Sequence, residues 1–267
     1  MVAGGYMILT IDIGNTVIAL GIFKENKLTY VFNLDTDNKR SSDLYLADLV
    51  MLFNVHKIEP KQIKEAIISS VVPILTSSFV ENVTKLCGIE PLIVGRKTKT
   101  GLPLRVDNPS ELGADLVAVS VGAINKFKSP IIIVDYGTAN KFLYIDNNSA
   151  LAGAIFTPGL TISYDALVNR TAQLPSVSLE KPINILGKNT KDCLNSGAVY
   201  GNVAMISKLC EMIEKEVGFK CIKILTGGNA KYLKDELKDE FIYEENLIHE
   251  GLLTILLKTK GESKNEK

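Results

Sequence analysis

The sequence lacks an excess of charge of either sign, because Lys+Arg and Asp+Glu both number 30 among its 267 residues. A formal net charge of zero gives no overall electrostatic attraction to nucleic acid or to an anionic membrane surface. The chain also lacks an apolar run approaching the ~18 residues that a membrane span needs. The sequence therefore argues against a nucleic-acid partner and against a membrane protein.

Cysteine and histidine are also scarce. The four cysteines include no C-x-x-C pair, and the only histidines are His56 and His249. Neither a zinc site nor a disulfide framework is expected from these residues. The first six residues lack the basic region of a secretion signal. We therefore expect a cytoplasmic protein with unpaired thiols and with flexible ends at residues 1–6 and 258–267.

What the sequence does contain is a strand meander near its N-terminus. An alternating apolar run ends at Asp12, a tight turn follows at Gly14-Asn15-Thr16, and two further β-rich runs span residues 17–23 and 27–34. The pattern places a single carboxylate, that of Asp12, on the buried side at the first turn.

The same pattern returns in the second half of the chain. An apolar run from Ile131 ends at Asp135, and Gly137-Thr138-Ala139 forms a turn before another strand. Aligning Asp12 with Asp135 places Gly14 on Gly137, so the chain reads as two related halves. Two Asp-x-Gly turns of this kind predict a nucleotide clamp.

Phosphate chemistry explains why these residue types matter. Small residues let the backbone approach a polyphosphate, and turn N–H groups together with the Thr16 or Thr138 hydroxyl can donate hydrogen bonds to it. An aspartate at each strand end can hold a cation that offsets the phosphate charge. The alternative is that both turns are ordinary hairpin connections.

Two more segments carry candidate chemistry within an α/β pattern of strands alternating with helices. Asp115 is a lone carboxylate in the apolar helix predicted over 112–124, where it could act as a general base or simply cap the helix or face solvent. A third Gly-rich turn, at 226–230, follows a strand and precedes a helix. Such a turn can admit a nucleotide close to backbone amides, or it can be only a turn.

Taken together, these residues resemble the type III pantothenate kinase family, which belongs to the superfamily of acetate and sugar kinases, Hsp70 and actin. The resemblance spans residues 7–256 and rests on the joint order of its motifs. These motifs are Asp12-Ile-Gly-Asn-Thr16, Ser69-Ser-Val-Val-Pro73, Asn108-Pro109 with Glu111 and Gly113-Ala-Asp115, Asp135-Tyr-Gly-Thr-Ala139, Thr157-Pro-Gly159, Arg170-Thr-Ala-Gln-Leu-Pro175, Gly187-Lys-Asn-Thr190 and Thr226-Gly-Gly228.

The resemblance implies an α/β protein with a duplicated ribonuclease H-like, or actin-like ATPase, fold. It would have an N-terminal half at 7–115, a C-terminal half at 116–257 and a nucleotide cleft between them. The implied activity is ATP-dependent phosphorylation of pantothenate, the first step of coenzyme A biosynthesis. The implied form is a homodimer that uses Mg²⁺ and a monovalent cation, K⁺ or NH₄⁺.

The resemblance also implies a role for individual residues. Asp115 would take the proton from the pantothenate hydroxyl, Asp12 would lie near Mg²⁺ and Asp135 would ligate the monovalent cation. The implied ATP contacts are Asp12, Ile13, Gly14, Asn15, Thr16, Val17, Ile18, Ala19 and Thr138. The implied pantothenate contacts are Val106, Gly113, Ala114, Asp115, Leu116 and Thr190, the last a candidate for contact across the dimer.

Several positions depart from the family pattern. Leu116 stands where the family normally has Arg, Val119 where it has Asn, and Val106 where Tyr is common; Asn140-Lys141 replaces Thr-Thr, and Ala154 replaces the second Gly of a pair. Losing a guanidinium that could pair with the pantothenate carboxylate removes a contact of roughly 1.5–3 kcal/mol.

Three functions therefore compete. The first is an active pantothenate kinase, or a kinase of another small acceptor. The second is a nucleotide-binding sensor or regulatory protein without turnover, and the third is an ATPase-like hydrolase on the same scaffold. Because Asp12, Asp115, Asp135, Thr138 and Thr190 are all present, we expect an active kinase, with pantothenate as the leading acceptor.

Overall fold

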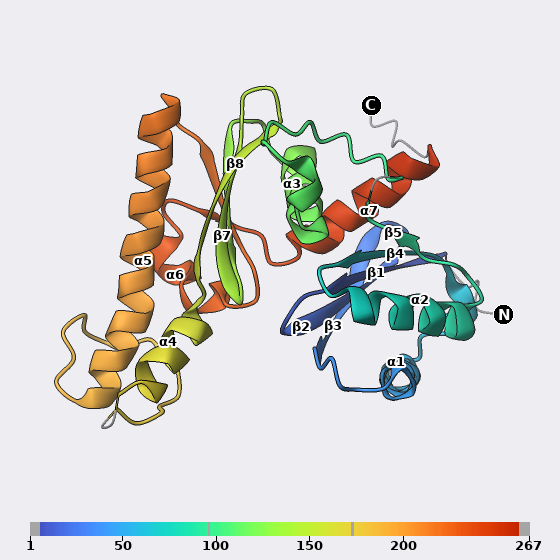
Figure 1. The fold of residues 1–267 in the computed structure, drawn as a ribbon, viewed down its shortest axis with the longest axis horizontal. Coiled ribbons are helices and arrows are strands. Elements are labelled where there is room, and N and C mark those ends of the chain that lie inside the picture. The colour runs from blue at the N-terminus through green and yellow to red at the C-terminus, as the bar shows by residue number, and fades with distance from the viewer. Residues whose placement is uncertain (1–5, 96, 172–173, 262–267) are drawn as a thin grey trace. The chain divides into compact units, whose positions relative to one another are not determined.

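The computed structural model describes residues 6–95, 97–171 and 174–261 (Figure 1). The chain forms two compact units. Within the described residues, the first unit comprises the chain up to Leu102, Ser110–Asn125 and the segment from Leu247 onwards. The second unit comprises Pro103–Pro109 and Lys126–Asn246. Each unit is built around its own five-stranded sheet.

The sheet of the first unit has the strand order β3-β2-β1-β4-β5. Its central strand β1 pairs with β2 in antiparallel orientation and with β4 in parallel orientation. The strands are β1 (Met7–Ile13), β2 (Val17–Lys24), β3 (Lys27–Asp35), β4 (Ile63–Ser70) and β5 (Leu92–Ile93). The helices are α1 (Ser42–Val55), α2 (Pro73–Cys87), α3 (Ala114–Lys126) and α7 (Leu247–Lys260), with short 3₁₀ turns at Pro60–Gln62 and Pro109–Glu111.

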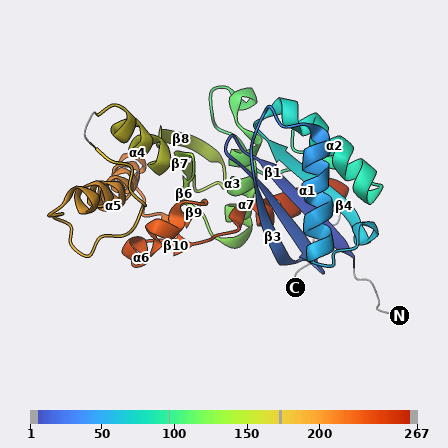
Figure 2. The same ribbon diagram turned by 90° about the horizontal axis from the view of Figure 1, so that it is seen from below.

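Strand β1 is buried along almost its whole length because helices cover both of its faces. Leu9, Ile11 and Ile13 belong to the same core as Tyr45 of α1 and Phe79 of α2. The alternate residues of β1 point to the opposite face, where α7 lies (Figures 1 and 2). Asp12 is on this second face, together with Thr10.

The sheet of the second unit repeats this arrangement, with the strand order β10-β9-β6-β7-β8. Its central strand β6 pairs antiparallel with β7 and parallel with β9, as β1 does with β2 and β4. The strands are β6 (Ile131–Tyr136), β7 (Ala139–Ile145), β8 (Leu151–Pro158), β9 (Ile222–Thr226) and β10 (Ile242–Tyr243). The helices are α4 (Leu160–Asn169), α5 (Thr190–Val217) and α6 (Lys234–Leu237), with a 3₁₀ turn at Ala230–Tyr232. The equivalent pairing of the two sheets confirms the predicted duplication.

The long helix α5 supplies much of the second unit's core. Val199, Ile206 and Cys210 of α5 pack in one apolar cluster with Val134 and Phe142 of the sheet. α5 begins at an N-cap, where the Asn189 side chain accepts a hydrogen bond from the Asp192 backbone N–H, and it ends at the left-handed Gly218.

The compact units differ from the predicted halves 7–115 and 116–257. The predicted boundary lies inside α3, whereas α3 and α7 both belong to the first unit. A Cβ atom on Gly251 of α7 would lie 1.8 Å from the carbonyl oxygen of Ala118 in α3. The two helices therefore touch through their backbones, and this contact keeps the C-terminal helix with the N-terminal sheet.

The predicted flexible end at 258–267 is also wrong at its start. α7 continues to Lys260, whose ammonium group pairs with Glu65 on β4. Residues 262–267, and residues 1–5 of the predicted N-terminal flexible end, lie outside the described residues. Among the helices that are described, none is both long and apolar enough to cross a membrane.

Candidate active-site residues

The turn between β1 and β2 is built by backbone hydrogen bonds that leave its tip exposed. The Gly14 N–H donates to the Val17 carbonyl oxygen at 3.0 Å, and the Thr36 hydroxyl donates to the Gly14 carbonyl oxygen at 2.7 Å. Asn15, Thr16 and Val17 are exposed. The turn therefore presents its backbone and two polar side chains outward from a fixed position.

Only part of the predicted ATP-binding stretch can use its side chains for binding. Ile13 and Ile18 are fully buried in the core of the first unit, so they can offer a ligand only backbone groups. Asp12 and Ala19 are half-buried and lie opposite each other on the paired strands β1 and β2. A Cβ atom on Gly14 would lie 3.0 Å from the Val17 carbonyl oxygen, a tight contact that favours a residue without a side chain there.

Asp115 lies at the same end of the first sheet as Asp12. Asp12 is opposite Ser69 in the β1–β4 register, and the Val71 N–H just beyond donates to the Ile13 carbonyl oxygen at 3.0 Å. A Cβ atom on Gly113 would lie 3.3 Å from Val71 Cγ1 and 2.3 Å from Asp115 Oδ1. Continuous contacts thus connect the carboxyl ends of β1 and β4 to Asp115.

Asp115 lies in a partly buried environment at the start of α3. Asp115 is in the first turn of α3, where the helix dipole favours a carboxylate. The residue is half-buried, and its Oδ1 atom is shielded from solvent, as is Oδ1 of Asp12. The side chain is therefore only partly exposed, and a helix-terminal position and a chemical role are compatible with each other.

The predicted substrate residues are divided between the two units. Gly113, Ala114 and Leu116 belong to the first unit, while Val106 belongs to the second. Leu116 and Val119 are buried on α3, with 6% and 2% of their surface exposed. Leu116 therefore behaves as a core residue of α3 and presents little side-chain surface to a ligand.

Thr190 is the first residue of α5 and is exposed. It lines a cavity of about 370 Å³ in the second unit, together with Leu160 and Tyr164 of α4 and Gly197 of α5. A Cβ atom on Gly187 would lie 2.4 Å from the Cys193 backbone nitrogen, so the loop before Thr190 packs directly on the first turn of α5.

The second Asp-x-Gly turn joins β6 to β7 and is held by its neighbours. The Gly159 N–H donates to the Thr138 carbonyl oxygen at 3.1 Å, and the Asn229 side chain donates to the Gly137 carbonyl oxygen at 3.1 Å. A Cβ atom on Gly159 would lie 2.1 Å from the Thr138 carbonyl oxygen, so this approach requires glycine. Thr138 is exposed at the tip.

The third Gly-rich turn lies beside the second. Asp135 on β6 is opposite Thr226 on the parallel strand β9, and the Asn229 N–H donates to the Tyr136 carbonyl oxygen at 3.0 Å. Gly227 has a φ of +96°, and a Cβ atom on it would lie 2.6 Å from Asp135 Oδ1. Two Gly-rich turns thus meet around Asp135 within the second unit.

Asp135 is already paired with a cation of the chain itself. The Lys141 Nζ atom lies 2.9 Å from Asp135 Oδ2, and the two side chains are 23% and 15% exposed. A free cation about 4 Å from this ammonium group is repelled by about 4 kcal/mol at an effective dielectric constant of about 20, which offsets most of its attraction to the carboxylate. The monovalent cation predicted at Asp135 therefore does not fit this site.

Magnesium requires a different set of ligands from a monovalent cation. It is usually held by one or two carboxylates plus phosphate oxygens and water. Within the described ranges no group of three or more His, Cys, Asp or Glu side chains could hold a metal ion. The single carboxylate of Asp12, at the end of β1 beside an exposed turn, fits a magnesium ion whose remaining ligands are phosphate oxygens and water.

Known proteins match the chain over most of its length. The sequence profile of a family described as type III pantothenate kinase matches residues 8–212. The type III pantothenate kinase of Moorella thermoacetica is 36% identical over 246 residues, which cover 92% of this chain and 97% of that protein. The type III pantothenate kinase of an Exiguobacterium species is 36% identical over 249 residues, which cover 93% and 98%.

The chain belongs to the type III pantothenate kinase family. This finding confirms the resemblance predicted from the order of the sequence motifs. The family profile ends at residue 212, whereas the two relatives cover more than nine tenths of the chain.

Solved structures establish the fold. The ethanolamine utilization protein EutJ from Carboxydothermus hydrogenoformans matches with a TM-score of 0.50 and 12% identity, covering 94% of this chain and 89% of that one. MreB 5 of Spiroplasma citri bound to AMPPNP matches with a TM-score of 0.51 and 10% identity, covering 96% and 97%. These likenesses and the duplicated mixed sheets confirm the predicted actin-like ATPase fold.

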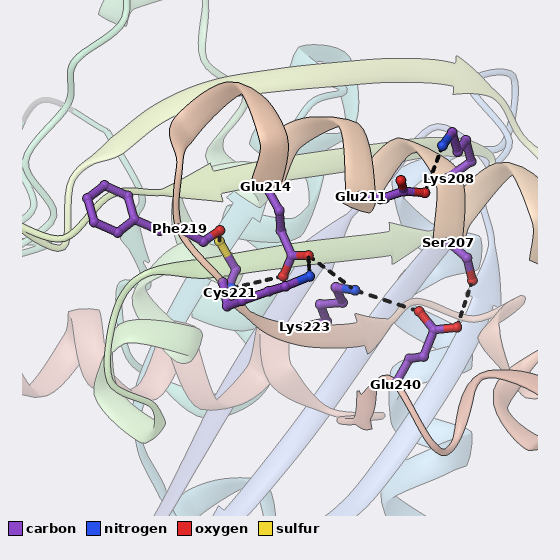
Figure 3. A network of polar contacts seen from close by, with 9 residues as sticks. Ser207, Lys208, Glu211, Glu214, Phe219, Cys221, Lys223 and Glu240 are labelled. Carbon is purple, nitrogen blue, oxygen red and sulfur yellow. Dashed lines mark hydrogen bonds and ion pairs between the residues drawn. The ribbon is translucent and has the colours of Figure 1, made fainter.

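A separate polar network in this pantothenate kinase family member lies at the other end of β9 (Figure 3). The buried Glu214 accepts hydrogen bonds from the Cys221 N–H at 3.0 Å and from Lys220 at 2.8 Å, and Lys223 lies between Glu214 and Glu240. Burial raises the pKa of Glu214, but these hydrogen bonds outweigh it and leave the pKa below 4.5. The network joins α5 to β9 at the strand's amino end, away from the Gly-rich turns.

Lys141 stands out in the sequence only as a departure from the family pattern, and its contact with Asp135 was not predicted. The hairpin pattern indicates this contact, because residues 135 and 141 are equally far from Thr138 along the sequence. Directly opposite residues of an antiparallel pair point to the same face. An aspartate and a lysine in such positions predict an ion pair.

Proposed function

We propose that this protein phosphorylates the hydroxyl group of pantothenate with ATP and thereby catalyses the first step of coenzyme A biosynthesis. Family membership supports the reaction. The observation that carries the proposal in this chain is Asp115, a half-buried carboxylate whose neighbouring contacts lead to the Asp12 turn. The reaction needs a base and a phosphate-binding turn, and the first unit contains candidates for both.

The nucleotide is proposed to bind through its phosphates. The exposed backbone and side chains of Asn15 and Thr16 donate to phosphate oxygens, and Thr138 is a further proposed ATP contact. Asp12 would hold Mg²⁺, and the ion would supply neutralisation of the phosphate charge. Ile13 and Ile18 take part only through their backbones, since their side chains are buried.

Asp115 is proposed to accept the proton of the pantothenate hydroxyl. As that oxygen bonds to the γ-phosphorus, the bond from phosphorus to the β–γ bridging oxygen breaks and ADP leaves. The proton remains on the Asp115 carboxyl group until it passes to solvent. Most of the rate enhancement in such reactions comes from positioning and charge neutralisation, so the close packing of Gly113 against Asp115 is expected to matter.

Pantothenate is proposed to contact Val106, Gly113, Ala114, Asp115, Leu116 and Thr190. Because Leu116 presents little surface, its contribution is limited to shape.

The homodimer is proposed from the loop before Thr190, where Ile183, Ile185 and Leu186 are 96%, 66% and 80% exposed. Burying such side chains in a partner stabilises association. Light scattering of the purified protein measures its molar mass in solution and so tests the proposed homodimer. The predicted cytoplasmic location stays a prediction.

A second candidate is a nucleotide-binding protein without turnover on pantothenate. The buried Leu116, at a position where the family normally has an arginine, favours it because no guanidinium is available there for the pantothenate carboxylate.

The test is ADP release with ATP and Mg²⁺, with and without pantothenate. The Asp115→Asn variant is expected to lose pantothenate-dependent turnover and to retain ADP binding. Asp43→Asn is a matched control, because Asp43 also lies in the first turn of a helix of the first unit. Pantothenate-independent or absent turnover in the unmodified protein would reject the pantothenate assignment.

A further inference from the structure

The Lys141–Asp135 pair lies where two Gly-rich turns converge. Asp135 Oδ2 accepts a hydrogen bond from Lys141 Nζ at 2.9 Å. Its other oxygen, Oδ1, faces the Gly137 and Gly227 positions, where added Cβ atoms would lie 3.7 and 2.6 Å away. One carboxylate thus connects the ammonium group to both turns.

The pair is a fixed part of the sheet. β6 and β7 place the two residues directly opposite each other, and Asn140 beside Lys141 is fully buried and donates to the Pro158 carbonyl oxygen at 3.0 Å. Both side chains are mostly shielded, so solvent and salt screen the pair less than an exposed ion pair. The ammonium group therefore supplies one localised positive charge at a constant position.

We propose that the ammonium group of Lys141 acts as a built-in monovalent cation at Asp135, so that nucleotide binding and turnover need neither K⁺ nor NH₄⁺. The charge and the donor chemistry are those of NH₄⁺, and the carboxylate that would attract a free cation is neutralised from within the chain. The proposal deepens the proposed function and rests on it only for the identity of the reaction.

An ordinary cross-strand ion pair would contribute to stability alone. If Lys141 substitutes for a cation, removing its ammonium group must also create a site that free cations can fill. This difference separates the two roles experimentally.

The experiment compares the unmodified protein with Lys141→Met and Lys141→Arg at constant ionic strength, with choline, Na⁺, K⁺ or NH₄⁺ as the only monovalent cation. ADP affinity with Mg²⁺ is measured by calorimetry, and ADP release with pantothenate is measured in parallel. Lys208→Ala is the control, because Lys208 also pairs with a carboxylate of the second unit but is 63% exposed on α5.

The unmodified protein and Lys208→Ala are expected to bind ADP equally, within about twofold, in all four salts. Lys141→Met is expected to bind ADP about tenfold more weakly in choline, and K⁺ or NH₄⁺ is expected to restore the affinity. Lys141→Arg is expected to stay independent of the cation.

A tenfold gain in ADP affinity of the unmodified protein on adding K⁺ would overturn the proposal, even if Lys141→Met did not fold. A folded Lys141→Met variant without any cation response would overturn it too. Cation-independent ADP binding without pantothenate turnover would reject the proposed function and leave this inference standing.

Discussion

Acidification is expected to destabilise the first unit through His249. The residue lies on α7, is 2% exposed, and its Nδ1 atom is 2.8 Å from the Thr10 hydroxyl on β1. A Cβ atom on Gly21 would lie 2.7 Å from the same Nδ1, so the ring fills a space that a glycine leaves open. Burial lowers the pKa of His249 from 6.5 to about 4.

The sign of the effect follows from the two protonation states. Between pH 6.5 and about 4 the unfolded chain carries a protonated His249 and the folded chain a neutral one, so the unfolded state binds more protons. The contribution of neutral His249 to stability is therefore fully present above the pKa of the unfolded chain and decreases as the pH falls. With 1.36 kcal/mol per pKa unit, the loss is roughly 2 kcal/mol at about pH 5 and approaches about 3 kcal/mol near pH 4.

Denaturant unfolding followed by circular dichroism at about pH 7 and about pH 5 measures this loss. His249→Gln keeps a polar side chain near Thr10 but cannot titrate, so its loss between the two pH values is expected to be smaller by about 2 kcal/mol. Ile255→Val on the same helix is the control, with a cost of about 0.5–1.5 kcal/mol at both pH values. Equal pH-dependent losses in the unmodified protein and His249→Gln would show that His249 does not cause the loss.

Three further substitutions test other parts of the structure. Gly251→Ala is expected to cost about 2 kcal/mol or more, measured as a fall in Tm, because its Cβ atom would lie 1.8 Å from the Ala118 carbonyl oxygen. Glu214→Gln is expected to cost about 1–3 kcal/mol at neutral pH, and progressively less below pH 4.5, because protonation removes the same charge from the unmodified protein. Gly227→Ala is expected to weaken ADP binding in calorimetry, because a φ of +96° disfavours alanine and the new Cβ atom would displace Asp135 Oδ1.

Each of these predictions has a matched control. Gly201→Ala adds a Cβ atom on α5 that meets nothing within 4 Å and is expected to keep or raise the Tm. Glu211→Gln removes an exposed carboxylate from the same helix as Glu214 and is expected to change stability little. Gly228→Ala adds a Cβ atom in open space beside Gly227 and is expected to retain ADP binding. An effect in a control equal to that in its partner would contradict the corresponding prediction.

Apolar runs along the chain were enough to predict the strands that lead into the first two Gly-containing turns. Asp12 and Asp135 each lie at the end of a buried strand before such a turn, and an apolar run is a local property that one sequence displays. The repeated order of strand, Asp-x-Gly turn and strand then predicted the duplication, which the equivalent pairing of β1 and β6 confirms.

Contacts between distant segments could not be predicted in this way. Gly251 meets Ala118 and His249 meets Thr10 across more than 130 residues of sequence, and no local pattern marks either contact. The domain boundary was placed wrongly for the same reason, because the position of α7 on the first sheet is decided by tertiary packing. The Lys141–Asp135 pair was predictable in principle from hairpin symmetry, whereas the burial of Leu116 depends on how α3 packs.

The most direct test of the proposed function is the rate of ADP release by the purified protein with ATP and Mg²⁺, measured with and without pantothenate for the unmodified protein, Asp115→Asn and Asp43→Asn. We expect pantothenate-dependent release that Asp43→Asn retains and that Asp115→Asn lowers by at least about a hundredfold. Pantothenate-dependent release that survives in Asp115→Asn would contradict the assigned base. Release unaffected by pantothenate in the unmodified protein would contradict the proposed function itself.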